Sequence, residues 1–128
     1  MQQHQPYSIP LRRELLDAEK ALLLRILERE APHRIPEVAM LKVVARCGCG
    51  KCPTVIFGAA LDAEPRPARP FTEVANYMGI NAEGLLVGVV LLEREGCLSE
   101  LEAWSPKGGE VMSWPEPANL ERVGEGGA

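Results

Sequence analysis

The chain has 128 residues, of which 46% are hydrophobic and 25% are charged, and its net charge is −4 at a sequence pI near 5.2. This length suits one domain with one core, and the composition fits neither a disordered chain nor a coiled coil. The acidic balance argues against nucleic-acid binding, which usually needs a basic surface. We therefore expect a single domain over residues 1–128, with residues 1–8 and 124–128 flexible.

The first predicted element is an amphipathic helix that begins at Asp17. Its apolar side chains recur at three and four residues, and charged side chains take the opposite face. Asp17 is a suitable N-cap, and Pro32 ends the helix because a proline disfavours helical geometry in the residue before it. The leucines of residues 11–16 leave two possibilities open. The helix extends upstream to Ser8, or a separate turn packs beneath its start.

Two strands are predicted next, at residues 38–46 and 54–61. In both segments apolar side chains recur at every second residue, which is the period of a half-buried strand. A loop of about six residues, rich in glycine and cysteine, separates them. The two segments therefore predict a β-hairpin whose loop is longer than the tightest turns.

A second hairpin is predicted at residues 84–94 and 97–104. The first of these segments is apolar on both faces, as expected for a central strand. Glu95-Gly96 supplies the turn, because glycine readily adopts a positive φ. A turn of two residues would place Val90 opposite Leu101 in the neighbouring strand.

These elements together predict an α+β fold. The N-terminal amphipathic helix packs on one face of a four-stranded antiparallel sheet made of the two hairpins. The proline-rich stretch at residues 63–70 is expected to be an irregular connection. The segment after residue 104 is also expected to be irregular and to pack along a sheet edge.

Neither a membrane segment nor a secretory signal is predicted. The longest apolar run, Gly84–Leu92, is much shorter than the roughly 20 residues of a membrane-spanning helix. The first residues contain no basic segment followed by an apolar one. We expect a cytoplasmic protein, in which the four cysteines are thiols or metal ligands rather than disulfides.

Three cysteines lie close together in the sequence, in the segment between the strands of the first hairpin. Cys49 and Cys52 have the two-residue gap of a metal knuckle, and Cys47 precedes them. Zinc takes four such ligands, so the candidate metal site is completed by Cys97 or, alternatively, by His33. Two other interpretations stay open: the cysteines are small packing residues at a tight turn, or they are redox-active thiols. The redox interpretation is weaker because the segment leads into a strand and not into a helix N-terminus, which would lower a thiol pKa.

A second group of candidate residues predicts binding of a protein partner. Glu100 and Glu102 share one face of a strand, and tryptophan and methionine are typical anchors of interfaces. The alternative is that the aromatic rings cover the protein's own core. The sequence contains no catalytic motif, so no catalytic residue is predicted. The candidate partner-binding residues are Glu100, Glu102, Trp104, Met112 and Trp114.

Two short motifs resemble a family of small uncharacterised bacterial proteins. They are Cys-Gly-Cys-Gly-Lys-Cys-Pro-Thr at residues 47–54 and Leu-Ser-Glu-Leu-Glu at residues 98–102. Proteins of that family are similar in plan, with a leading helix, a turn that contains Cys-Pro-Thr and a late strand. The cysteine turn of this chain departs from their pattern by the additional Lys51. By analogy of size and acidity, the resemblance implies an immunity protein of a contact-dependent growth inhibition system.

The sequence thus predicts a non-enzymatic protein-binding module. The expected role is that of a bacterial immunity protein, which neutralises a basic toxin such as a nuclease by masking its active surface. The expected partner is a cationic toxin domain, with no nucleic acid, membrane or cofactor involved. A small zinc-binding domain at the cysteine turn is the alternative, and a thiol-dependent enzyme is the second alternative.

Overall fold

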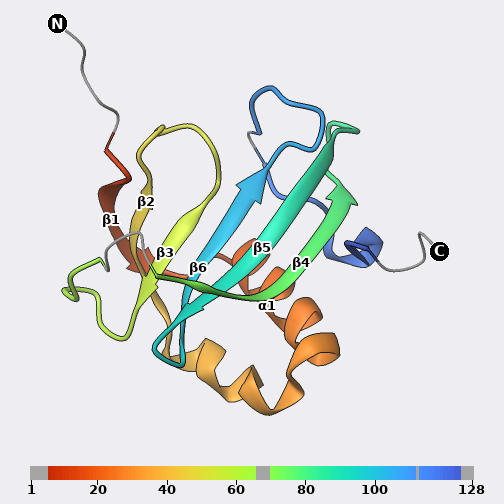
Figure 1. The fold of residues 1–128 in the computed structure, drawn as a ribbon. Helices are drawn as coiled ribbons and strands as arrows, with labels where there is room; N and C mark the ends of the chain where they lie inside the picture. Colours follow the sequence, from red (N-terminus) through yellow and green to blue (C-terminus); the bar gives the residue numbers. More distant parts are fainter. Residues whose placement is uncertain (1–5, 66–69, 112, 125–128) are drawn as a thin grey trace, which may run out of the picture.

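The computed structural model describes residues 6–65, 70–111 and 113–124. Within these residues the chain forms one seven-stranded antiparallel sheet in the order β1-β2-β3-β6-β5-β4-β7, with helix α1 behind and below it (Figure 1). The elements in chain order are β1 (Ser8–Glu14), α1 (Asp17–Glu30), the 3₁₀ helix η1 (Pro32–Met40), β2 (Lys42–Cys47), β3 (Val55–Gly58), β4 (Thr72–Ile80), β5 (Leu86–Arg94), β6 (Cys97–Trp104), the 3₁₀ helix η2 (Pro117–Asn119) and β7 (Glu121–Arg122).

The predicted four-stranded sheet is wrong, because three further strands belong to it. Both predicted hairpins exist, as β2–β3 and β5–β6, and the pairing of β3 with β6 joins them. β4 pairs with β5 along most of its length, and β1 and β7 form the two edges. The protein is therefore mostly sheet, and the α+β description with four strands misses nearly half of the strands.

The segment before the helix forms the edge strand β1 and neither an upstream helix nor a separate turn. β1 pairs antiparallel with β2, and its register shifts between Pro10 and Arg13. Pro10 lacks a backbone N–H, and an edge strand tolerates this because one side of it needs no partner. The leucine spacing that suggested a helix instead places Leu11 against the main core.

Helix α1 begins at Asp17 and ends at Glu30, just before Pro32. The N-cap is Leu16 and not Asp17, and the buried Glu19 takes over the capping role. The Glu19 carboxylate accepts the backbone N–H of Leu16 at 2.7 Å and pairs with the Arg13 guanidinium at 2.8 Å. This buried ion pair ties the end of β1 to the first turn of the helix.

The main core lies between α1 and one face of the sheet. The apolar stripe of α1 supplies Leu22, Leu23, Ile26 and Leu27, which are fully buried. A smaller second cluster, Val44, Ala45 and Ile56, lies apart from the main core, with Ala63 packed against it. The main core on the sheet side consists of Val43, Val55, Phe57, Ala75, Tyr77, Val89, Leu91, Leu98 and Leu101.

Two predicted strand boundaries and one predicted register are wrong. Residues 38–41 were expected to start a strand, but 38–40 complete the 3₁₀ helix η1, which contains Pro36. The strand predicted at 54–61 is confined to β3, Val55–Gly58. In the second hairpin the register shifts between Leu92 and Glu93, so Val90 pairs with Glu102 and not with Leu101. This β-bulge places one extra residue in β6, and the residues after it therefore face the opposite side of the sheet from the one that a regular hairpin would give them.

The C-terminal segment returns to the sheet edge. η2 and β7 lie next to β4, and the amide of Val123 donates to the carbonyl oxygen of Asn76 at 2.8 Å. Leu120 is buried in the main core. Among the helices of residues 6–65, 70–111 and 113–124, none combines the length and the apolar character needed to cross a membrane.

Trp104 on β6 lies directly across from Gly88 on β5. A Cβ atom at Gly88 would lie 2.0 Å from the indole Cε2, so the ring occupies the space that a side chain would fill. We expect Gly88→Ala to lower the free energy of unfolding by about 1–3 kcal/mol through overpacking. Urea titration of Gly88→Ala alone and in a Trp104→Ala background checks this. An equal cost of the alanine in both backgrounds would contradict the contact.

Candidate metal centre

The turn between β2 and β3 carries the three clustered cysteines and is anchored to the sheet. The amide of Cys47 donates to the carbonyl oxygen of Thr54 at 3.2 Å, which closes the turn. The Thr54 hydroxyl oxygen accepts the backbone N–H of Ala103, on β6, at 2.9 Å. Gly50 has φ +70°, a left-handed conformation that glycine adopts without strain. The turn is therefore a defined structure and not a loose loop.

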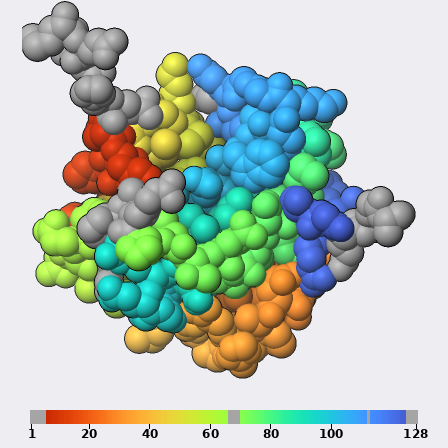
Figure 2. Space-filling model, viewed as in Figure 1, coloured from red at the N-terminus to blue at the C-terminus, as the bar shows by residue number. Residues whose placement is uncertain are grey.

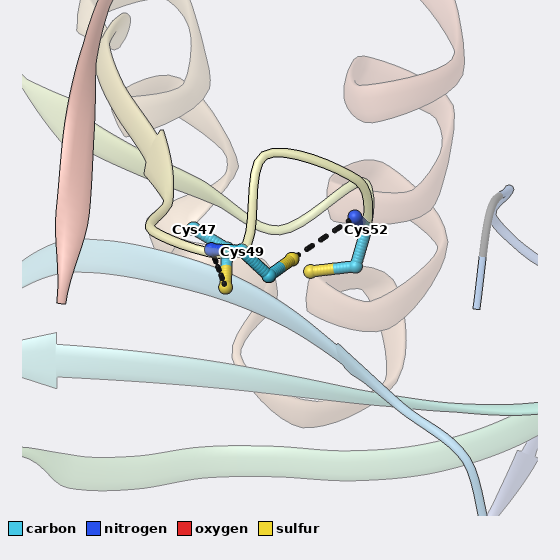
Figure 3. A group of neighbouring side chains, drawn as sticks. All are labelled: Cys47, Cys49 and Cys52. Carbon is cyan, nitrogen blue, oxygen red and sulfur yellow. Dashed lines mark hydrogen bonds between the residues drawn. The ribbon is translucent and has the colours of Figure 1, made fainter. Parts of the chain in front are cut away.

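The three cysteine sulfurs converge. The Sγ atoms of Cys47, Cys49 and Cys52 all lie within 4.8 Å of one another, and Figure 3 shows them at the mouth of the turn. In a tetrahedral zinc site with Zn–S distances near 2.3 Å, neighbouring sulfurs are about 3.8 Å apart. The sulfurs thus need only a small inward movement to share one metal ion. All three side chains are half-buried.

Backbone amides of the turn point at the sulfurs. Figure 3 shows two of the hydrogen bonds that they donate: the Cys49 Sγ accepts one from the amide of Cys52 at 3.3 Å, and the Cys47 Sγ accepts one from the amide of Cys49 at 3.5 Å. The Cys49 Sγ also accepts one from the amide of Lys51 at 3.4 Å. The Cys52 amide is the main cause that lowers the pKa of the Cys49 thiol to about 7. A helix N-terminus is therefore not needed to activate this thiol, because the turn supplies the donors.

Cys47 shows the opposite shift. Burial raises the pKa of the Cys47 thiol to about 12. Near neutral pH the turn thus combines a thiolate-forming Cys49 with a protonated Cys47. A metal ion must displace the Cys47 proton, so its binding releases protons and weakens as the pH falls.

The predicted fourth ligands lie away from these sulfurs. Cys97 is exposed and begins β6, whereas Ala103, which contacts the turn, lies near the other end of that strand. His33 lies in η1, directly after α1. Among the described residues, the group whose ligand atoms lie within 4.8 Å of one another contains the three cysteines of the turn. Neither Cys97 nor His33 joins it.

The turn instead borders a cavity that contains two carboxylates. This cavity of about 320 Å³ is lined by Cys47 and Cys52 on one side and by Glu100 and Glu102, from β6, on the other. Glu100, one of the predicted partner-binding residues, is buried, with only 1% of its surface exposed. The hydroxyl of Tyr7, just before β1, donates a hydrogen bond to its carboxylate.

Burial perturbs the acidic groups of this cavity. It raises the pKa of Glu100 to about 7, and it also raises the pKa of Glu102. The pKa of Tyr7 is raised by burial and by its contact with the Glu100 carboxylate. The sequence pattern did not indicate Tyr7, because its contact with Glu100 joins segments that are far apart in the chain.

The two predicted tryptophans contact the protein itself. Trp104 covers Gly88, and among the described residues its buried indole N–H has no hydrogen-bond partner. Trp114 is partly buried and packs against the main core. Met112 lies outside the described residues. A protein partner and a thiol-dependent enzyme both stay predictions.

The segment after β6 also borders the turn. In Figure 2 the turn and this segment lie side by side at the top of the molecule. Lys51 pairs with Glu110 at 3.3 Å, and a second cavity, of about 440 Å³, lies between Cys49, Cys52 and Trp104. The sulfurs are therefore reachable from solvent on two sides.

Comparison with known proteins identifies no relative. No protein-family model matches the chain, and no curated protein or solved structure matches it either. The resemblance to small bacterial proteins, and the immunity role inferred from it, therefore stay predictions. The geometry of the cysteine turn is the feature of the molecule that indicates a function.

Proposed function

We propose that this chain is a metal-binding domain that holds zinc through the thiolates of Cys47, Cys49 and Cys52. The observation that carries the proposal is the convergence of the three sulfurs within 4.8 Å. Thiolates are soft ligands and favour Zn²⁺ or Cu⁺ over hard cations such as Mg²⁺ and Ca²⁺. Of the metals with tetrahedral preference, zinc is the one most often held by such a knuckle.

The environment of the turn favours bound thiolates. The amides that donate to the Cys49 and Cys47 sulfurs stabilise the charged form of each ligand. The Arg46 guanidinium donates to the carbonyl oxygen of Cys52 at 3.2 Å and brings a positive charge to the turn. Together with the metal ion, these groups offset the negative charge of three thiolates in a half-buried position.

The metal would stabilise the turn and not create the fold. The strands on either side belong to a large sheet with its own core, and Thr54 ties the turn to Ala103 without a metal. The metal-free protein should therefore stay folded, in contrast to a classical zinc finger, and binding should raise its stability by mass action.

Metal analysis of the protein purified without chelator tests this function. We expect close to one zinc per chain, loss of that zinc on treatment with EDTA, and a lower melting temperature afterwards. Cys97→Ser is the matched control, because it removes the one cysteine outside the turn and should retain the zinc. Less than a tenth of an equivalent of any thiophilic metal in the untreated protein would overturn the proposal.

A further inference from the structure

The turn supplies three ligands, and zinc takes four. Among the described residues no other histidine, cysteine, aspartate or glutamate has a ligand atom within 4.8 Å of all three sulfurs. The fourth position therefore falls to a water molecule or to a side chain that reaches the metal by a change of rotamer. The cavity beside the turn contains two candidate carboxylates, Glu100 and Glu102.

Glu102 shares the 320 Å³ cavity with Cys47 and Cys52. Its carboxylate is half-buried, and within the described part of the chain no hydrogen bond or ion pair engages it. A half-buried carboxylate without a partner is costly unless a cation or a donor is present. A metal ion held by the neighbouring thiolates would provide that cation.

The other two carboxylates near the turn are already engaged. Glu100 is more deeply buried and accepts the hydrogen bond from the Tyr7 hydroxyl. Glu110 lies on the other side of the turn, is largely exposed and pairs with Lys51. Of the three, Glu102 alone combines burial, proximity to the cavity and a free carboxylate.

The backbone places Glu102 next to the contact between β6 and the turn. Its neighbour Ala103 donates its amide to the Thr54 hydroxyl at 2.9 Å, so Glu102 is one residue from the contact that fixes β6 to the turn. Consecutive Cα atoms are 3.8 Å apart, and a glutamate side chain has three rotatable bonds. Rotation of this side chain, with no movement of the strand, can bring one carboxylate oxygen toward the sulfurs.

We propose that Glu102 is the fourth ligand, so that the centre is a tetrahedral site of three thiolates and one carboxylate oxygen. This inference rests on the proposed function of the turn. The zinc–oxygen bond would be about 2.0–2.2 Å long. It would link β6 to the β2–β3 turn through the metal and would fill the coordination position that otherwise opens into the cavity.

Titration of the metal-free protein with Co²⁺ as a spectroscopic probe tests the inference. The thiolate-to-cobalt charge-transfer band counts the sulfur ligands, and the d–d bands report the fourth ligand. Glu102→Gln should shift the d–d bands, leave the charge-transfer band at its three-thiolate intensity and weaken zinc binding about 10- to 100-fold. Glu102→Ala, which leaves no ligand atom at this position, should shift the d–d bands in the same way. Glu110→Gln and Glu110→Ala are the matched controls and should leave both sets of bands unchanged.

The outcomes separate the two proposals. Absence of a charge-transfer band in the unsubstituted protein would overturn the thiolate site and the fourth ligand together. A three-thiolate band with d–d bands that neither Glu102 variant changes would overturn the fourth ligand alone and assign that position to water. Circular dichroism checks that Glu102→Ala is folded, and Glu102→Gln, which is nearly isosteric, gives a second readout.

Discussion

Replacing Cys49 with serine should lower the zinc affinity by at least about 100-fold, because loss of a direct ligand costs more than loss of an outer contact. Cys49 is the central ligand of the turn: its sulfur accepts two backbone amides, and its pKa is lowered to about 7. A serine hydroxyl stays protonated at neutral pH and is a poor ligand for zinc. Competition with a chromophoric chelator measures the affinity, and Cys97→Ser should retain the affinity of the unsubstituted protein.

The stability of the metal-free protein separates loss of a ligand from loss of the fold. The turn is closed by Cys47 and Thr54 through backbone atoms, which serine at position 49 leaves in place. Unfolding of Cys49→Ser in the presence of EDTA should therefore agree with the unsubstituted protein within about 0.5 kcal/mol. Equal zinc affinities of Cys49→Ser and the unsubstituted protein would show that the turn is not the zinc site.

The elements that the sequence pattern predicted well have strong periodicity. The apolar residues of α1 recur at three and four residues, so they lie on one side of a helix and can be buried there together. Pro32 follows closely after the helix and prevents its extension. β5 is apolar on both faces, and its consecutive buried residues lie on both of them, as expected for a central strand. The turn at Glu95-Gly96 then fixes where β6 begins, and Arg94 pairs with Cys97 as a two-residue turn requires.

The missed strands lack a local signal that separates them from alternatives. β1 contains a proline, its one leucine, Leu11, lies at helical spacing from Leu15, and only its pairing with β2 makes it a strand. β4 directly follows the proline-rich stretch and pairs with a strand later in the chain. Such pairing depends on tertiary contacts, which override weak local preference. The two-residue β7 is too short for any pattern.

In the candidate site, too, the features with a local sequence signal were predicted and the features that depend on tertiary contacts were not. The spacing of Cys47, Cys49 and Cys52 makes their proximity a local property, so the sequence could indicate it. The position of Glu102 beside them depends on the β3–β6 pairing and on the bulge near Leu92, both of which are long-range features. The buried state of Glu100 depends on a tyrosine far away in the chain. The sequence pattern therefore could not indicate that Glu100 is buried.

The stability of the metal-free protein should fall as the pH rises from about 5 to 7, and Glu100→Gln should remove most of this dependence. Burial raises the pKa of Glu100 from 4.5 to about 7, so the folded state binds this proton more tightly than the unfolded state. The stabilisation is complete below pH 4.5 and is lost as the pH passes 7, and its size is about 3 kcal/mol. Urea unfolding at several pH values in EDTA measures it.

Two further variants test the cause of the shift. Tyr7 donates to the Glu100 carboxylate and thereby lowers the pKa that burial raises, so Tyr7→Phe should move the midpoint of the pH dependence upward. Glu102→Gln should remove a smaller part of the dependence, because Glu102 is less buried than Glu100. The pKa of Cys49 is lowered to about 7, so ionisation of this thiol adds stability as the pH rises above 7. This contribution lies above the range from pH 5 to 7 in which the effect of Glu100 is measured. An equally steep dependence in Glu100→Gln and the unsubstituted protein would mean that Glu100 is not held protonated by the cavity.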